Sequence, residues 1–245
     1  MRGYVESGVV EAVRAAGGEL YAITSEPQAL AARARDDWQL PFECIGDPHH
    51  EIADASRERG WLDLRTQEAD EFLIRDTVWD VVHPKGFFHP GVLVLNSEGH
   101  LLYRWRSVPT RANAGSAAGR PSPTYVWGRV HAALAQEPGK DAALDEAPTL
   151  DDKPVIFPLF AAALMANGWF MRPKAFTYQG DGKNPMKRVP IVLLRLLLFV
   201  LLWVAAFAVL PTLWVSAALI LYLPVAVRGL RKVYTIFQNE ALDSR

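Results

Sequence analysis

Four residues of metal-ligating type lie close together in the sequence: Cys44, Asp47, His49 and His50. Zinc usually takes four ligands in tight tetrahedral geometry, and this spacing matches no standard zinc site. Asp47 and Pro48 are better explained as the start of a helix, with both histidines in its first turn. We therefore expect the segment to hold neither a metal ion nor another cofactor.

Cys44 is the only cysteine of the chain, so an intrachain disulfide framework is excluded. As a redox or nucleophilic thiol it would need a helix N-terminus or a nearby cation to form a thiolate. It instead follows Phe42 and precedes Ile45, in a segment that we expect to be a strand. Free cysteine is commonly a small buried hydrophobe, and we favour that role. A resolving role, in which Cys44 pairs with a cysteine outside these residues, is the alternative.

Other candidate groups are histidines and arginines. His83 and His89 flank a loop that contains proline and glycine, and they are weak acid–base candidates. A predicted basic loop would bind an anion, lie on acidic lipid headgroups, or simply be solvated, and its members are Arg104, Arg106, Arg111 and Arg120. The chain contains no Ser-His-Asp order, glycine-rich phosphate loop or carboxylate pair typical of an enzyme class.

The charges divide the 245-residue chain into two parts. Residues 1–153 carry 16 Lys and Arg against 24 Asp and Glu, whereas residues 154–245 carry 10 against 3. The formal net charge of −1 argues against a general nucleic-acid binder. The pattern predicts an acidic soluble domain followed by a basic, apolar module.

The apolar module contains 32 consecutive residues without a formal charge, Leu196–Val227. One continuous helix of that length would measure about 48 Å against about 30 Å of hydrocarbon, so one straight span is too long. Pro211 interrupts the run and favours a break. We expect a spanning helix over Val189–Leu210 and a second segment over Thr212–Val227, which is short for a full span. A tight hairpin fits best, or one span plus a re-entrant piece.

Basic residues flank both sides of this hairpin, with Lys187 and Arg188 before it and Arg228 and Arg231 after it. By the positive-inside rule, both ends lie in the cytoplasm. Arg195 is the one charge inside the first span: it would mark an ion pathway or, as we favour, a side chain that snorkels to the interface. We expect Trp203, Trp214 and Tyr222 near the interfaces, with packing between the helices as the alternative for Trp203.

A further uncharged stretch, Pro154–Met171, contains Pro158, Asn167 and Gly168. It is better explained as an interfacial or re-entrant helix than as a full span.

In the soluble part, apolar spacing and turn residues predict an alternation of helices and strands. The first elements expected are a helix over Val5–Ala16, a strand over Glu19–Thr24 and a helix capped by Ser25 and running to Trp38. An extended segment over Leu40–Ile45 and a helix over His49–Arg59 follow, and residues 61–88 are irregular or carry a short helix at Ala69–Arg75. The last elements are a β-hairpin of Gly91–Leu95 and Leu101–Trp105 and a helix capped by Ser122 and running to Ala135. This is the order of a thioredoxin-like fold without its first strand. In that fold a proline, usually cis, precedes the hairpin, and Pro90 is placed for this role.

Three segments of the N-terminal part are distinctive: Leu20–Thr24, PFECIGDP at 41–48 and HPGVLVLNSEGHLLYRW at 89–105. Through them, residues 1–135 resemble the peroxiredoxin-like redoxins, the alkyl hydroperoxide reductase and thiol-specific antioxidant family. The resemblance implies reduction of peroxides or disulfides by a thiolate, with a thiol electron donor as partner and with Pro90 and His89 near the active site. The family's reactive cysteine precedes the first helix, and this sequence has none there. We expect that the cysteines lie upstream of Met1; alternatively, the protein has lost them.

We predict a redoxin domain over residues 1–135, followed by a linker over 136–153. An interfacial or re-entrant segment with a loop follows over 154–187. A transmembrane hairpin over 188–228 and a cytoplasmic tail over 229–245 complete the chain. We expect an α/β protein bound to the lipid bilayer of the cytoplasmic membrane, with its redoxin domain in the cytoplasm. The expected function is thiol oxidoreduction, inactive in these residues alone, and a non-catalytic membrane-tethered scaffold is the alternative.

Overall fold

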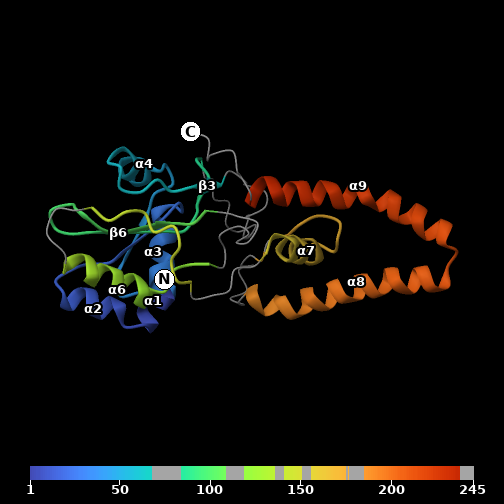
Figure 1. Ribbon diagram of the computed structural model, residues 1–245, viewed down its shortest axis with the longest axis horizontal. Coiled ribbons are helices and arrows are strands. Elements are labelled where there is room, and N and C mark those ends of the chain that lie inside the picture. The colour runs from blue at the N-terminus through green and yellow to red at the C-terminus, as the bar shows by residue number, and fades with distance from the viewer. Residues whose placement is uncertain are drawn as a thin grey trace. The chain divides into compact units, whose positions relative to one another are not determined.

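The computed structural model of the protein describes residues 1–67, 84–108, 119–135, 141–150, 156–174, 176 and 185–237 (Figure 1). The described residues form two compact units. The N-terminal unit contains those up to residue 150, and the C-terminal unit contains those from residue 156 onward. The predicted helix at 69–75 lies outside the described residues.

The N-terminal unit alternates helices with short strands. Its elements are α1 (Arg2–Glu6), α2 (Val9–Ala15), β1 (Tyr21–Thr24), α3 (Gln28–Asp37), β2 (Glu43–Gly46), α4 (Glu51–Glu58), β3 (Thr66–Gln67), β4 (Phe87–Phe88), β5 (Gly91–Leu95), β6 (Leu101–Arg106) and α6 (Pro123–Leu134). The C-terminal unit contains α7 (Phe157–Asn167), the 3₁₀ turn η2 (Pro185–Arg188), α8 (Val189–Val209) and α9 (Thr212–Phe237). The chain is therefore a mixed α/β protein with two long apolar helices at its C-terminal side.

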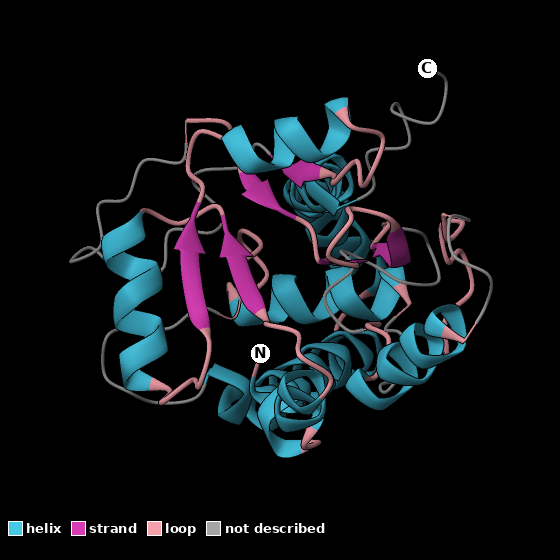
Figure 2. Ribbon diagram, turned by 90° about the vertical axis from the view of Figure 1, so that its left-hand side faces the viewer, coloured by secondary structure: helices cyan, strands magenta, loops and turns pink. Residues whose placement is uncertain are grey.

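The strands form three separate two-stranded ladders among the described residues (Figure 2). β1 and β2 run parallel, in register from Tyr21 opposite Glu43 to Thr24 opposite Gly46. Because parallel neighbours need a crossover, α3 connects them. β3 pairs with β4 and β5 with β6, both antiparallel.

The first predicted helix is divided in two. Gly8 has a φ of 71° and separates α1 from α2, so the expectation of one helix over Val5–Ala16 is wrong. A glycine takes this left-handed conformation without the steric cost that a Cβ would add. Val10 of α2 still reaches the core, where it packs with Ala31 of α3 and Phe42.

Ser25 does not cap the next helix as expected. α3 begins after Pro27 without a side-chain cap, and the Oγ of Ser25 instead accepts a hydrogen bond from the Phe88 amide over 3.4 Å. The Gln28 side chain, in the first turn of α3, binds the backbone of β2. Its amide nitrogen donates to the Cys44 carbonyl over 3.0 Å and its oxygen accepts from the Gly46 amide over 2.7 Å, which ties α3 to β2.

The β5–β6 hairpin is confirmed, with a bulge between Val94 and Leu95. The predicted cap of the last helix is also confirmed, because the Ser122 Oγ accepts from the Tyr125 amide over 3.0 Å. The helix α6 packs on β6 through a cluster whose buried members are Tyr103, Trp105, Val126 and Val130.

The peptide bond before Pro90 is trans, as are all described peptide bonds, so the expected cis isomer is wrong. The neighbouring backbone contacts fit an extended trans segment. The His89 amide donates to the Arg65 carbonyl over 2.8 Å, and the Pro90 carbonyl accepts from the Ser107 amide over 2.8 Å. Trans is also the intrinsically preferred isomer of an X–Pro bond.

Residues 141–150 are not a free linker. Leu144 forms a parallel bridge with Arg104, and Leu150 forms an antiparallel bridge with Pro121. The Leu101 amide also donates to the Asp141 carboxylate over 2.8 Å. This part of the predicted linker therefore belongs to the N-terminal unit.

In the C-terminal unit, Pro211 separates two helices as predicted, but the second helix is longer than expected. It runs for 26 residues, through Pro224 and past Val227, so the expectation of a segment too short to span is wrong. The basic positions after Val227 continue the helix because its end packs on α7: Val233 is fully buried against Ala161 and Leu164.

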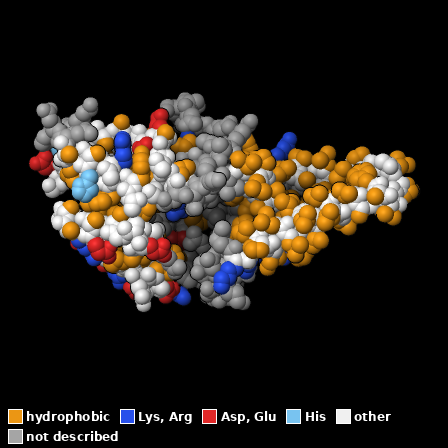
Figure 3. All heavy atoms as spheres, turned by 60° about the horizontal axis from the view of Figure 1, so that its bottom comes forward, with side chains coloured by type: hydrophobic (Ala, Val, Ile, Leu, Met, Phe, Trp, Pro, Cys, Tyr) orange, Lys and Arg blue, Asp and Glu red, His pale blue; other side chains and the backbone are white. Residues whose placement is uncertain are grey.

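Both α8 and α9 are long and apolar enough to cross a membrane. Apolar side chains cover the surface of this hairpin (Figure 3), and Val209, Leu213 and Leu221 are more than three-quarters exposed. Exposed apolar surface of this extent is unfavourable in water. The two helices are therefore compatible with membrane association.

The α7 helix has 11 residues, about 16 Å of rise, and is shorter than the hydrocarbon core of a bilayer. It packs against both α8 and α9. Trp203 of α8 packs toward α9. Its ring lies 6.2 Å from that of Phe199 in the same helix and 6.4 Å from that of Tyr222 in α9. Trp214 lies in the first turn of α9, next to the connection from α8, and is 71% exposed.

Candidate functional site

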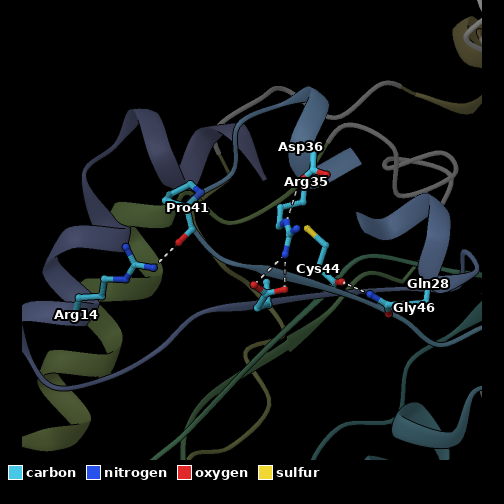
Figure 4. Close-up of polar contacts among 8 residues, drawn as sticks. Arg14, Gln28, Arg35, Asp36, Pro41, Cys44 and Gly46 are labelled. Atoms are coloured by element: carbon cyan, nitrogen blue, oxygen red, sulfur yellow. Dashed lines mark hydrogen bonds and ion pairs between the residues drawn. The ribbon is translucent and has the colours of Figure 1, made fainter. Parts of the chain in front are cut away.

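Cys44 lies in the core of the N-terminal unit. Figure 4 shows the polar contacts beside it, in which the Gln28 side chain donates to the Cys44 carbonyl and Arg35 donates to Asp36. The residue lies in β2 and is 3% exposed. The cluster around it contains Val10, Ala31, Leu40 and Phe42. No helix begins at Cys44, so it lacks the free amide groups that stabilise a thiolate.

The electrostatic environment of Cys44 also disfavours the thiolate. Burial raises the pKa of the Cys44 thiol, and the positive charge of Arg35 offsets only part of this effect. Arg35 is engaged elsewhere, because its guanidinium donates to both carboxylate oxygens of Glu43, over 2.9 and 2.8 Å, and to Asp36 over 3.0 Å. A protonated, enclosed thiol is a poor nucleophile at neutral pH.

His89 is also buried. It follows β4, is 7% exposed and directly precedes the half-buried Pro90. Burial, helped by the positive charge of Arg65, lowers the pKa of His89 to about 4. The imidazole is therefore neutral at physiological pH. His83, the other histidine of interest, lies outside the described residues.

Of the four candidate metal ligands around residue 47, Cys44 lies in the core and Asp47 and His50 make structural contacts. His49 is exposed. The Asp47 carboxylate accepts the amides of Ile52 and Ala53, each over 3.1 Å, at the start of α4. His50 has its ring nitrogen 3.2 Å from the Gly86 carbonyl and its ring centroid 4.4 Å from that of Phe88. Across the described ranges, no group of three or more His, Cys, Asp and Glu is placed to hold a metal ion.

The predicted basic loop is divided. Arg104 and Arg106 belong to β6 and bind the chain after α4. Arg104 donates to the carbonyls of Gly60 and Trp61 over 2.8 and 3.2 Å, and Arg106 donates to the carbonyl of Asp63 over 3.0 Å. These contacts make the two arginines structural. Arg120 is exposed, and Arg111 lies outside the described residues.

A polar contact that the sequence analysis missed joins residue 145 to the core. The Asp145 Oδ2 accepts the hydroxyls of Tyr103 over 3.0 Å and Tyr125 over 2.9 Å. Burial and the neighbouring carboxylate raise the pKa of both tyrosines. The contact joins β6, α6 and the chain after α6, and its long sequence separation left no local signal.

The C-terminal unit carries the clearest concentration of one charge. A cavity between the end of α7 and the beginning of α8 is lined by Arg172, Lys174, Arg188 and Arg195. The expectation for Arg195 is a single snorkelling side chain, whereas in the structure it lies with three other cationic side chains. The sequence does carry a signal for a cationic cluster, because residues 156–237 contain nine Lys and Arg and one acidic residue, Asp181.

Comparison of the chain with protein-family models, curated proteins and solved structures finds no match.

Proposed function

We propose that the chain is a membrane-anchored, thioredoxin-like protein of the peroxiredoxin-like redoxin type, which acts in thiol-dependent reduction of peroxides or disulfides. The observation that supports it is the arrangement of the N-terminal unit. A parallel β1–α3–β2 crossover is followed by the β5–β6 hairpin and by α6 packed on β6. This is the order that the resemblance of residues 1–135 implies.

The separation of the ladders supports the same proposal. Among the described residues β1 pairs with β2 alone and β5 with β6 alone. In a thioredoxin-like domain, a further strand lies between these two pairs and leads to the reactive cysteine. Tyr21 and Ile23 of β1 are 58% and 46% exposed, which is unusual for apolar residues of an inner strand.

The reactive thiol in this proposal is not Cys44, which is buried and has a raised pKa. The function therefore requires a thiolate from outside these 245 residues. We expect the 245-residue chain in detergent to show no peroxide reduction above background with dithiothreitol as reductant. A rate that disappears in Cys44→Ser would assign the chemistry to Cys44 and contradict this expectation.

The decisive experiment maps the native N-terminus in host membranes by mass spectrometry and sequences the DNA upstream of the Met1 codon. Two results together support the oxidoreductase. The first is an in-frame extension that contains a strand and a cysteine motif. The second is that dimedone traps a sulfenic acid on a cysteine of this motif after peroxide treatment. A native start at Met1 without trapped cysteine rejects it.

A non-catalytic scaffold is the second candidate function. The inaccessible Cys44 favours it, because the chain's own thiol is unsuited to catalysis. The same mapping experiment separates the two functions. In the scaffold case, cross-linking in host membranes should capture a defined protein partner on the N-terminal unit.

We further propose that the N-terminal unit and both ends of the hairpin face the cytoplasm, in the cytoplasmic membrane. Positive charge at both ends of the hairpin supports this orientation. In a Cys44→Ser background, an impermeant maleimide should label His131→Cys and Arg231→Cys only from the cytoplasmic side. Thr212→Cys, at the first residue of α9, should label from the opposite side. Labelling of the first two from opposite sides contradicts the proposal.

A further inference from the structure

The cavity in the C-terminal unit has the size and the lining of a binding site. Its volume is about 310 Å³, at the lower end of the range for small-ligand pockets. Four cationic side chains line it: Arg172 and Lys174 from the chain after α7, Arg188 from η2, and Arg195 from α8. No acidic residue lines it among the described part of the chain.

The charge balance around the cavity is one-sided. In residues 156–237, the single acidic residue is Asp181, which lies outside the described residues. Like charges gathered in one cavity repel one another, most strongly where apolar surroundings lower the effective dielectric constant. An anion in the cavity would offset this repulsion. The guanidinium groups would bind a phosphate group in a bidentate manner.

The side chain of Arg195 is held at the wall of this cavity. Arg195 lies six residues into α8, about 9 Å along its axis. Its guanidinium lies over the Trp169 ring at 4.0 Å and donates to the Asn167 carbonyl over 3.4 Å. These contacts direct the charge toward the beginning of α8, as expected for an arginine that avoids hydrocarbon.

The turn that carries Trp169 has an unusual backbone. Trp169 and Phe170 have φ values of 56° and 60°, a conformation that side chains other than glycine rarely adopt. Surrounding contacts hold it in place. The Phe170 amide donates to Met165 over 2.7 Å, its carbonyl accepts from the Tyr222 hydroxyl over 2.8 Å, and its ring stacks on Phe199 at 3.8 Å. The turn that carries Trp169, beside the cavity, is therefore held by contacts with α7, α8 and α9.

We propose that this cavity binds a phosphate group, supplied by the headgroup of an anionic phospholipid or by a free phosphate anion. The cavity lies at the first turns of a helix that is long enough to span a bilayer, beside a 68% exposed tryptophan. Both features are typical of the headgroup level of a membrane. Basic pockets beside spanning helices at the cytoplasmic surface bind anionic headgroups.

The test uses the full chain in nanodiscs of phosphatidylcholine with a minor fraction of phosphatidylglycerol. Native mass spectrometry after release into detergent measures the retained phosphatidylglycerol. The main variant is Arg172→Gln/Lys174→Gln, because both residues are exposed and their replacement leaves the packed helices intact. The matched control is Arg228→Gln/Arg231→Gln, which removes the same charge from exposed positions of α9 outside the cavity.

We expect the main variant to bind the retained lipid about tenfold or more weakly than the control, since each lost charge-assisted hydrogen bond costs about that factor. Arg195→Gln should have the same effect, and Arg195→Lys should retain part of the binding because it keeps the charge but loses the bidentate geometry. Circular dichroism checks that all variants keep the helical content of the wild type.

A second arm adds inorganic phosphate to the same complexes and to protein in phosphatidylcholine alone. Retained phosphatidylglycerol that millimolar phosphate does not displace assigns the site to a lipid headgroup. Phosphate that binds without anionic lipid, and less to the main variant than to the control, assigns it to a free anion. Equal loss in the main variant and the control, or no binding of either probe, overturns the proposal.

Discussion

Acidification should loosen the N-terminal unit through His89. The pKa of this buried histidine is lowered to about 4, chiefly by burial and further by the charge of Arg65. An unfolded histidine titrates near 6.5. Between these two values the unfolded state binds more protons than the folded state, so the free energy of unfolding falls as the pH falls. The contribution is fully present above about pH 6.5 and is lost as the pH approaches 4.

The magnitude follows from the size of the shift. Each pKa unit corresponds to about 1.4 kcal/mol, and at about pH 4.5 the loss amounts to about 2.5 kcal/mol. That is roughly an 80-fold increase in the opening equilibrium. The reference pKa values of carboxylates, about 3.9 to 4.3, lie at the lower end of this window, so comparison with a variant that lacks the histidine is needed to isolate the contribution of His89.

Hydrogen exchange of the full chain in nanodiscs, resolved by mass spectrometry, measures this change locally. Peptides that cover β5 and β6 should lose about 2.5 kcal/mol of protection between about pH 7 and about pH 4.5, after correction for intrinsic exchange rates. His89→Gln cannot take up the proton and should lose most of this pH dependence. His131→Gln, at an exposed position of α6, is the control and should keep it. Equal pH dependence in His89→Gln and the wild type would refute the role of His89.

Three further substitutions test the packing of the N-terminal unit, each by the same exchange measurement. Gly46→Ala should destabilise by about 1–3 kcal/mol, because its Cβ would lie 2.5 Å from the backbone nitrogen of Gln28; unchanged protection of β1 and β2 would contradict this close approach. Asp145→Ala should cost about 1–3 kcal/mol by leaving the buried Tyr103 hydroxyl without its acceptor, and the cost should shrink in a Tyr103→Phe background. Ser122→Ala should cost about 1 kcal/mol, confined to the first turns of α6; a loss spread over the whole unit would argue against a capping role.

The elements that were predictable from sequence carry their own local signals. The β5–β6 turn is an example: the Asn96 side chain accepts the amides of Glu98 and His100 over 3.0 and 2.8 Å, and Gly99 has a φ of 86°. These residue types favour such a turn wherever they occur between two apolar runs. The Ser122 cap is local in the same way.

The features that escaped prediction depend on contacts distant in sequence. The polar composition of residues 136–153 indicates a linker, yet Leu144 in this stretch pairs with Arg104 of β6. The Tyr103–Asp145 hydrogen bond also holds this stretch, and it joins residues 42 positions apart. Ser25 has the residue type of a helix cap, yet its hydroxyl accepts from Phe88, 63 positions away. In both cases tertiary contacts override a local preference.

The length of α9 shows which part of a membrane prediction rests on charge and which on packing. The uncharged run ends at Val227, but the helix continues through Arg228 and Arg231 to Phe237. Formal charges mark where a chain leaves the hydrocarbon, because hydration of a charge is lost inside it. They do not end a helix, since arginine and lysine are good helix formers. The continuation is stabilised by burial of Val233 against α7, which a count of charges along the chain does not register. The end of α7 and the chain after it also meet the beginning of α8 at the cationic cavity, so both features that local sequence did not predict in this unit depend on the packing of α7.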